Sequence, residues 1–179
     1  MDDGDGLFDA PLSDRVEHSR EIGELISDGD RRRFAAKVVR TEGCWLWTGA
    51  ISSPDGYGRF SLSHGGRCVT VGAHRFALVA AGVELPGGAV AEHFCNEPLC
   101  VRVDSGHVFV SSQRANLAYA VASGRAAGSR VVVDSSRRLE RSRRVRQLAR
   151  DGFDIGRYRK ILARFSSVND TDPGQLALW

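Results

Sequence analysis

The stretch His93-Phe94-Cys95-Asn96-Glu97-Pro98-Leu99-Cys100 decides how this chain folds, together with the residues that follow it. Residues 89–92 predict a short strand, residues 95–100 a loop and residues 107–110 a returning strand. Ser112 can then cap a helix that runs to Ser123. The pattern predicts a strand–loop–strand–helix unit, written ββα below, whose loop carries two cysteines.

Metal-ligating side chains gather at one end of this hairpin. Cys95, Cys100 and His107 can converge because they stand in the loop and at the start of the returning strand. A closed structural zinc site needs four ligands. Cys44, which opens an aromatic strand, is favoured as the fourth. Cys68 is the alternative, although its mid-strand position also suits a thiol that packs as a small apolar group.

Two further polar residues of the unit suit a different task. His93 ends the first strand and Asn116 lies near the start of the helix, so the two are expected to face each other across the hairpin. A neutral imidazole can take a proton from water, and an amide oxygen is a ligand that suits Mg²⁺. The pair predicts Mg²⁺-dependent hydrolysis of a phosphodiester bond.

The rest of the chain supplies strands and helices around this unit. Three strands at residues 44–48, 57–62 and 67–71 predict a small antiparallel sheet, and helices are expected at residues 14–26, 30–39, 74–81, 136–150 and 154–165. The predicted fold is α+β: a small antiparallel sheet plus a zinc-bound ββα core with helical extensions at both ends. Three regions are expected: an acidic, partly disordered N-terminal extension (1–40), a nuclease core (41–125) and a basic helical tail (126–179).

Charge is distributed unevenly along the 179 residues. Residues 1–30 carry ten acidic and two basic side chains, whereas residues 125–164 carry thirteen basic and four acidic ones. A basic block of this kind indicates polyanion binding, here to double-stranded DNA. No apolar run is long enough for a membrane span, and the acidic N-terminus does not resemble a signal peptide. A cytoplasmic location is expected, where four cysteines favour metal binding over disulfides.

The basic tail admits two interpretations. Its two predicted helices are joined by a turn at Gly152, which is similar to a degenerate helix-turn-helix with Arg157, Arg159 and Lys160 on the second helix. Alternatively, it is a plain basic arm that contacts phosphates. Both interpretations make these three residues candidate DNA contacts.

About half of the chain resembles the HNH (His-Me finger) endonucleases of phages and mobile elements, and its cysteine spacing is similar to that of the His-Cys box homing endonucleases. The resemblance implies a general-base role for His93, a Mg²⁺-ligating role for Asn116 and a phosphate contact for Arg59. It also implies zinc ligation by Cys44, Cys95, Cys100 and His107. The matching stretches are residues 34–38, 43–49, 56–60, 73–75 and 93–101, then Asn116 and 124–125.

One departure from the family pattern bears on activity. Arg102 stands where the family has an Asn that orients the catalytic imidazole, and arginine has no acceptor with which to do so. A backbone carbonyl is the alternative partner for His93. The departure keeps open a DNA-binding protein without catalysis. A zinc-stabilised packaging or interaction accessory, with the acidic N-terminus as a protein contact, is the other alternative. The oligomeric state stays open as well, a homodimer included.

Overall fold

A computed structural model describes residues 23, 25–64, 67–86, 88–122 and 135–165. Within these ranges the fold is α+β, with small antiparallel sheets and five helices. Most of the predicted helix at 14–26 (all but residues 23, 25 and 26) and the C-terminal stop at Gly124 lie outside the described residues. The elements are α2 (Asp28–Ala35), β1 (Val38–Arg40), β2 (Trp45–Trp47), β3 (Ala50–Ile51), β4 (Gly58–His64), β5 (Arg67–Gly72), α3 (Ala73–Ala80), β6 (Ala89–His93), β7 (Val108–Ser112), α4 (Gln113–Ala122), α5 (Ser135–Arg150) and α6 (Ile155–Phe165).

Strand pairing differs from the expectation for the first strands. The three-stranded sheet has the order β3–β4–β5, while β2 pairs with β1 instead of joining it. On its other side β2 is hydrogen-bonded to the cysteine loop: Trp47 N donates to Leu99 O at 2.8 Å, and Val101 N donates to Trp45 O at 2.8 Å. The prediction that residues 44–48 belong to the same sheet as residues 57–62 and 67–71 is therefore wrong. Both edges of β2 are already hydrogen-bonded, one to β1 and the other to residues 99–101.

The helix predicted for residues 30–39 ends early. A capping box between Ser27 and Asp30 begins α2, and the helix stops at Ala35. The next residues, Val38–Arg40, form β1 against β2. Val38 and Val39 are β-branched, so extended backbone suits them, and pairing with β2 satisfies their polar groups.

Four aromatic rings form the centre of the hydrophobic core. Phe34 of α2 stacks on Trp47 with ring centroids 4.8 Å apart, and its centroid is 4.6 Å from that of Phe76 in α3. Phe60 of β4 completes the group, 4.5 Å from Phe76. The ring of Phe34 in α2 thus packs in the same core as the strands and helix that follow it.

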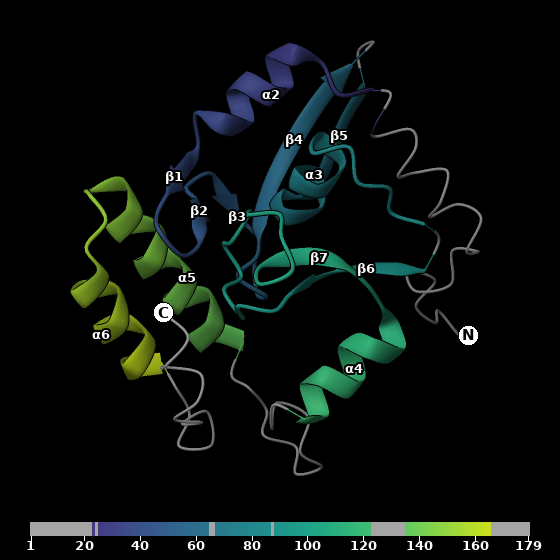
Figure 1. The fold of residues 1–179 in the computed structure, drawn as a ribbon. Coiled ribbons are helices and arrows are strands. Elements are labelled where there is room, and N and C mark those ends of the chain that lie inside the picture. The colour runs from purple at the N-terminus through teal and green to yellow at the C-terminus, as the bar shows by residue number, and fades with distance from the viewer. Residues whose placement is uncertain (1–22, 24, 65–66, 87, 123–134, 166–179) are drawn as a thin grey trace, which may run out of the picture.

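The ββα unit forms as predicted. β6 pairs antiparallel with β7 from Ala89↔Ser112 to His93↔Val108, and α4 follows directly. The Ser112 hydroxyl accepts a hydrogen bond from Ala115 N at 3.1 Å, as expected for a helix cap. In Figure 1, α4 extends from the end of this hairpin, below the β4–β5 arm and α3.

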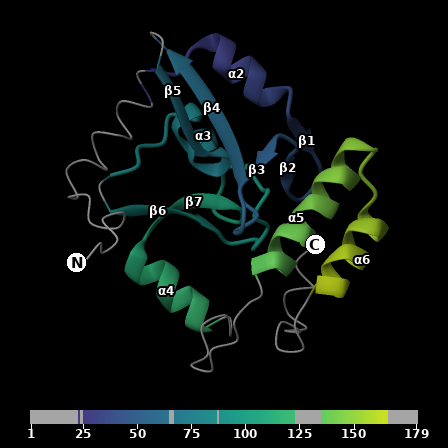
Figure 2. The ribbon, with the colours of Figure 1, turned by 180° about the vertical axis from the view of Figure 1, so that it is seen from behind.

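The tail helices pack against the opposite side of the molecule from α4. Figure 2 shows α5 and α6 side by side next to β1, β2 and β3. Val145, Leu148 and Tyr158 of this pair are buried, while Ile155 is 49% exposed. Among the described residues no helix has the length and apolarity to span a membrane.

Candidate metal centre and candidate active site

Three cysteines from distant parts of the chain form one buried cluster. The Sγ atoms of Cys44, Cys95 and Cys100 all lie within 4.8 Å of one another. Pairing between β2 and residues 99–101 brings Cys44, just before β2, to the loop that follows β6. Tetrahedral zinc with Zn–S bonds of about 2.3 Å needs sulfur atoms about 3.8 Å apart, so small movements would suit this cluster to zinc. Cys68, the alternative ligand, is exposed on β5 and outside the cluster.

The crowded thiols have perturbed acidities. Hydrogen bonding from Cys100, and then from Cys44, lowers the pKa of Cys95 to about 3. Hydrogen bonding with Cys100 raises the pKa of Cys44. The three crowded thiols therefore share protons and do not all ionise together. A divalent cation would replace those protons and neutralise the thiolates, as cysteine-rich metal sites require.

His107, the predicted fourth ligand, is not part of the mutual 4.8 Å group. Its Nδ1 lies 2.8 Å from Oδ1 of Asp104. Burial would raise the pKa of Asp104, but its hydrogen bond with His107 and the His107 charge lower it. A carboxylate on one ring nitrogen is a common arrangement for zinc-ligating histidines, because it fixes the tautomer. Ligation by His107 stays a prediction.

Arg102, which departs from the family pattern, ties the two cysteine-bearing segments together. Its Nη1 donates to the carbonyl oxygens of Glu42 and Gly43, each at 2.8 Å. Its Nε lies 2.6 Å from Oδ2 of Asp104. The guanidinium thus holds the turn before Cys44 against the loop that leads to β7, which is a structural use of this residue that the sequence did not reveal.

A backbone carbonyl orients the imidazole of His93. Nε2 of His93 lies 3.0 Å from the carbonyl oxygen of Cys100. A carbonyl oxygen can only accept, so Nε2 carries the proton in the neutral ring and Nδ1 keeps its lone pair. Burial lowers the pKa of His93, which disfavours the charged form. The partner that Arg102 could not supply is therefore provided by the cysteine loop.

Two other rings pack against His93. The centroid of His74 in α3 lies 4.6 Å from that of His93, and the Tyr57 centroid lies 5.7 Å from it. Nδ1 of His74 is buried and has no hydrogen-bond partner among the described residues. Burial, followed by the charges of His93, Arg75 and Arg59, lowers the pKa of His74 well below its usual value. No local sequence signal predicts that Tyr57 packs against His93, because the fold of the 52–57 loop brings it there.

Arg59 lies at the start of β4, near this group of rings. It pairs across β4–β5 with Gly72, the residue before α3, and its charge acts on His74. Its side chain is 41% exposed and forms an ion pair with Asp55 at 3.6 Å. An exposed guanidinium with one weak partner remains able to contact a phosphate.

Asn116 lies in the first turn of α4. Tyr119, one turn later, stacks on Phe94 with ring centroids 5.1 Å apart and donates from its hydroxyl to the Phe94 carbonyl at 3.1 Å. Residues three apart share a helix face. Asn116 and Tyr119 are half-buried, while Leu117 is 56% exposed. Asn116 thus shares a side of α4 with Tyr119, whose hydroxyl reaches the residue after His93. The meeting of Asn116 with His93 stays a prediction.

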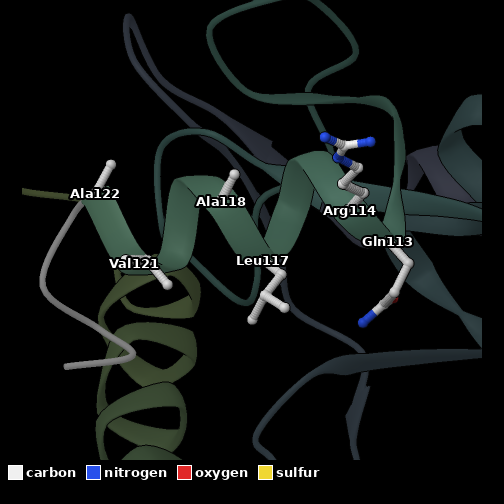
Figure 3. A pocket seen from close by; sticks show the side chains of 6 residues that line it. All are labelled: Gln113, Arg114, Leu117, Ala118, Val121 and Ala122. Atoms are coloured by element: carbon white, nitrogen blue, oxygen red, sulfur yellow. The ribbon is translucent and has the colours of Figure 1, made fainter. Parts of the chain in front are cut away.

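A shallow apolar surface runs along the outward face of α4. Figure 3 shows the side chains that line it, among them Leu117 and Val121, and Asn116 is not one of them. This surface is therefore separate from the residues that could carry chemistry.

The arginines of the tail are divided between the core and the surface. Arg157, Arg159 and Lys160 of α6 are exposed. In contrast, Arg146 donates to Gly49 O at 3.1 Å, and Arg150 Nε donates to Thr48 O at 3.0 Å. Part of the basic block therefore holds α5 against β2 and β3.

Comparison with known proteins supplies no relative from which a role could be transferred. No family model, curated protein or solved structure matches the chain.

Proposed function

We propose that this chain is a metal-dependent DNA endonuclease of the HNH (His-Me finger) type, with a structural zinc site. The observation that carries the proposal is the 3.0 Å contact between Nε2 of His93 and the Cys100 carbonyl, at the end of a ββα hairpin. It leaves Nδ1 of a buried histidine as a proton acceptor. Catalytic and structural roles meet in one loop, because Cys100 supplies both the carbonyl and a thiol.

Asn116 and Arg59 would complete the catalytic group. The α4 face that carries Asn116 packs toward Phe94, the neighbour of His93. A carboxamide oxygen is a hard ligand that suits Mg²⁺, and a bound Mg²⁺ would stabilise negative charge on the phosphate and on the leaving oxygen. Arg59 would add a charged hydrogen bond to the phosphate.

In the proposed reaction, His93 takes a proton from water through Nδ1. The resulting hydroxide attacks phosphorus, and the bond from phosphorus to the 3′ oxygen breaks in line with the attack. The products are a 5′ phosphate and a 3′ hydroxyl, which takes its proton from solvent. The Cys100 carbonyl keeps the ring in the tautomer that this step needs and stabilises the imidazolium that forms.

The cysteine cluster would serve structure instead of the reaction. Cys44, Cys95 and Cys100, together with His107, form the set of ligands proposed for zinc. Closing this site would fix the loop whose carbonyl orients His93. We further propose that exposed basic residues of α6, Arg157, Arg159 and Lys160, contact the DNA backbone.

Plasmid cleavage tests the proposal. With zinc-loaded protein, supercoiled plasmid should be nicked when Mg²⁺ is added and remain intact when Mg²⁺ is omitted. His93→Ala should slow nicking by about 10²–10⁴-fold, as expected for loss of a general base. Cys68→Ser, which changes an exposed residue outside the site, is the matched control and should cleave like the wild type.

Two outcomes would contradict the proposal. A folded His93→Ala protein that nicks at the wild-type rate would refute the role of His93. A wild-type protein that binds DNA tightly but cleaves none with Mg²⁺ would favour the alternative, a zinc-containing DNA-binding protein without catalysis.

A further inference from the structure

The most deeply buried charged group in the described part of the chain lies between two of the candidate zinc ligands and has no role in the proposed reaction. Glu97 is 0% exposed and stands in the loop between Cys95 and Cys100. One carboxylate oxygen, Oε1, accepts a hydrogen bond from Leu99 N at 3.1 Å, which shapes the loop. A buried carboxylate needs a positive partner, because the desolvation of an unpaired charge is costly.

That partner comes from the tail helices. Nη2 of Arg141 in α5 lies 2.8 Å from Oε2 of Glu97, and the same oxygen accepts a hydrogen bond from the Tyr158 hydroxyl of α6 at 2.8 Å. The Arg141 side chain is 17% exposed. Both tail helices are thus attached to the cysteine loop by one buried carboxylate.

The thiols also act on Arg141 through their charge. Burial alone would lower the pKa of Arg141, but the charges of Glu97 and Tyr158, then those of Cys44 and Cys95, raise it. With a divalent metal bound, three thiolates and one carboxylate would carry four negative charges against the two positive charges of the metal. The guanidinium therefore offsets part of the remaining charge in a place where water screens little.

We propose that Arg141, held by Glu97 and Tyr158, is a positioning residue for the metal centre, so that metal binding and docking of α5–α6 reinforce each other. This inference rests on the proposed metal site. If the docked tail stabilises the metal-loaded loop, the metal must stabilise the docked tail to the same extent, because such coupling is reciprocal. The tail then acts as a part of the metal centre and not as an independent appendage.

Zinc affinity of the full-length protein, measured by competition with a chromophoric chelator, tests the first half of this coupling. Arg141→Met should weaken zinc binding about 10–100-fold, the usual effect of removing a group that supports metal ligands. Arg144→Met is the matched control: it lies on the same helix but pairs with Glu140 at the surface, so its zinc affinity should equal that of the wild type. Arg141→Lys, which keeps the charge, should recover part of the loss.

Hydrogen exchange tests whether metal binding stabilises the docked tail. An ordinary structural ion pair would not make the exchange rates of α5 depend on zinc. Zinc should slow exchange of the α5 amides in the wild type about tenfold or more, and this protection should be lost in Tyr158→Phe. Tyr158→Phe removes one hydroxyl and keeps the ring, so it provides the comparison even if Arg141→Met fails to fold.

Three results would overturn the inference. Equal zinc affinities of Arg141→Met and Arg144→Met would show that Arg141 does not support the metal, and α5 exchange that ignores zinc would show that the tail is not coupled to it. In both cases the metal site itself would stand. A wild-type chain that binds no zinc would overturn the site and the coupling together.

Discussion

Replacing Cys44 with serine should remove most of the stability that zinc contributes. The cysteine cluster joins the segment before β2 to the loop after β6, so a metal held there ties together two parts of the chain that are distant in sequence. A ligand at about 1,000 times its dissociation constant stabilises the folded state by about 4 kcal/mol. For a chain of this size, each kcal/mol shifts the melting temperature by about 2–4 °C. The expected zinc-dependent rise is therefore about 8–16 °C in the wild type and close to zero in Cys44→Ser.

Thermal unfolding followed by circular dichroism, with excess zinc and with a chelator, measures this difference. Cys68→Ser is the matched control, because it makes the same chemical change at an exposed residue outside the cluster. It should keep the wild-type response to zinc. A wild-type melting temperature that does not change with zinc, or an equal loss in the two serine variants, would refute the assignment of Cys44 to a metal centre.

Three further predictions follow from the described geometry. Zinc affinity should decrease as the pH is lowered, by about tenfold per pH unit for each displaced proton. Hydrogen bonding with Cys100 raises the pKa of Cys44, so a bound proton competes with the metal. A zinc affinity that stays constant in chelator competition at several pH values would contradict this prediction. Phe34→Ala should lower the free energy of unfolding by about 3–5 kcal/mol, since its ring contacts three other core aromatics; a urea midpoint like that of the wild type would argue against this core. Replacing Arg157, Arg159 and Lys160 with alanine should weaken DNA binding and reduce the slope of log affinity against log salt by about 1 for each lost phosphate contact; an unchanged slope would exclude them as contacts.

Local signals in the sequence predicted most of the elements. The β6–β7 hairpin, the Ser112 cap of α4 and the pair of tail helices all agree with the structure to within a few residues. Each depends on turn residues, caps or apolar periodicity within a short window, where neighbours along the chain dominate. The convergence of Cys44 with the hairpin cysteines was also predicted, because Cys44 opens a strand whereas Cys68 lies in the middle of one.

Pairing between distant segments was not predictable in the same way. The sequence placed β2 in the three-stranded sheet, but its partners are β1 and residues 99–101. The extended conformation of Val38–Arg40 likewise depends on that pairing. Strand propensity indicates which residues are suited to a β-sheet, but it does not indicate which other strand they will pair with.

Local periodicity and spacing were enough to predict the ββα unit and to place its cysteines, His93 and Asn116 on their strands, loop and helix. The groups that contact these residues depend on tertiary packing. The Cys100 carbonyl fixes the His93 tautomer, Arg102 secures the turn before Cys44, and Glu97 meets Arg141 and Tyr158 from positions 44 and 61 residues further along the chain. Such contacts depend on which distant segments the packed core brings together. A count of charges along the sequence therefore cannot distinguish an arginine that contacts DNA from one that neutralises a buried carboxylate.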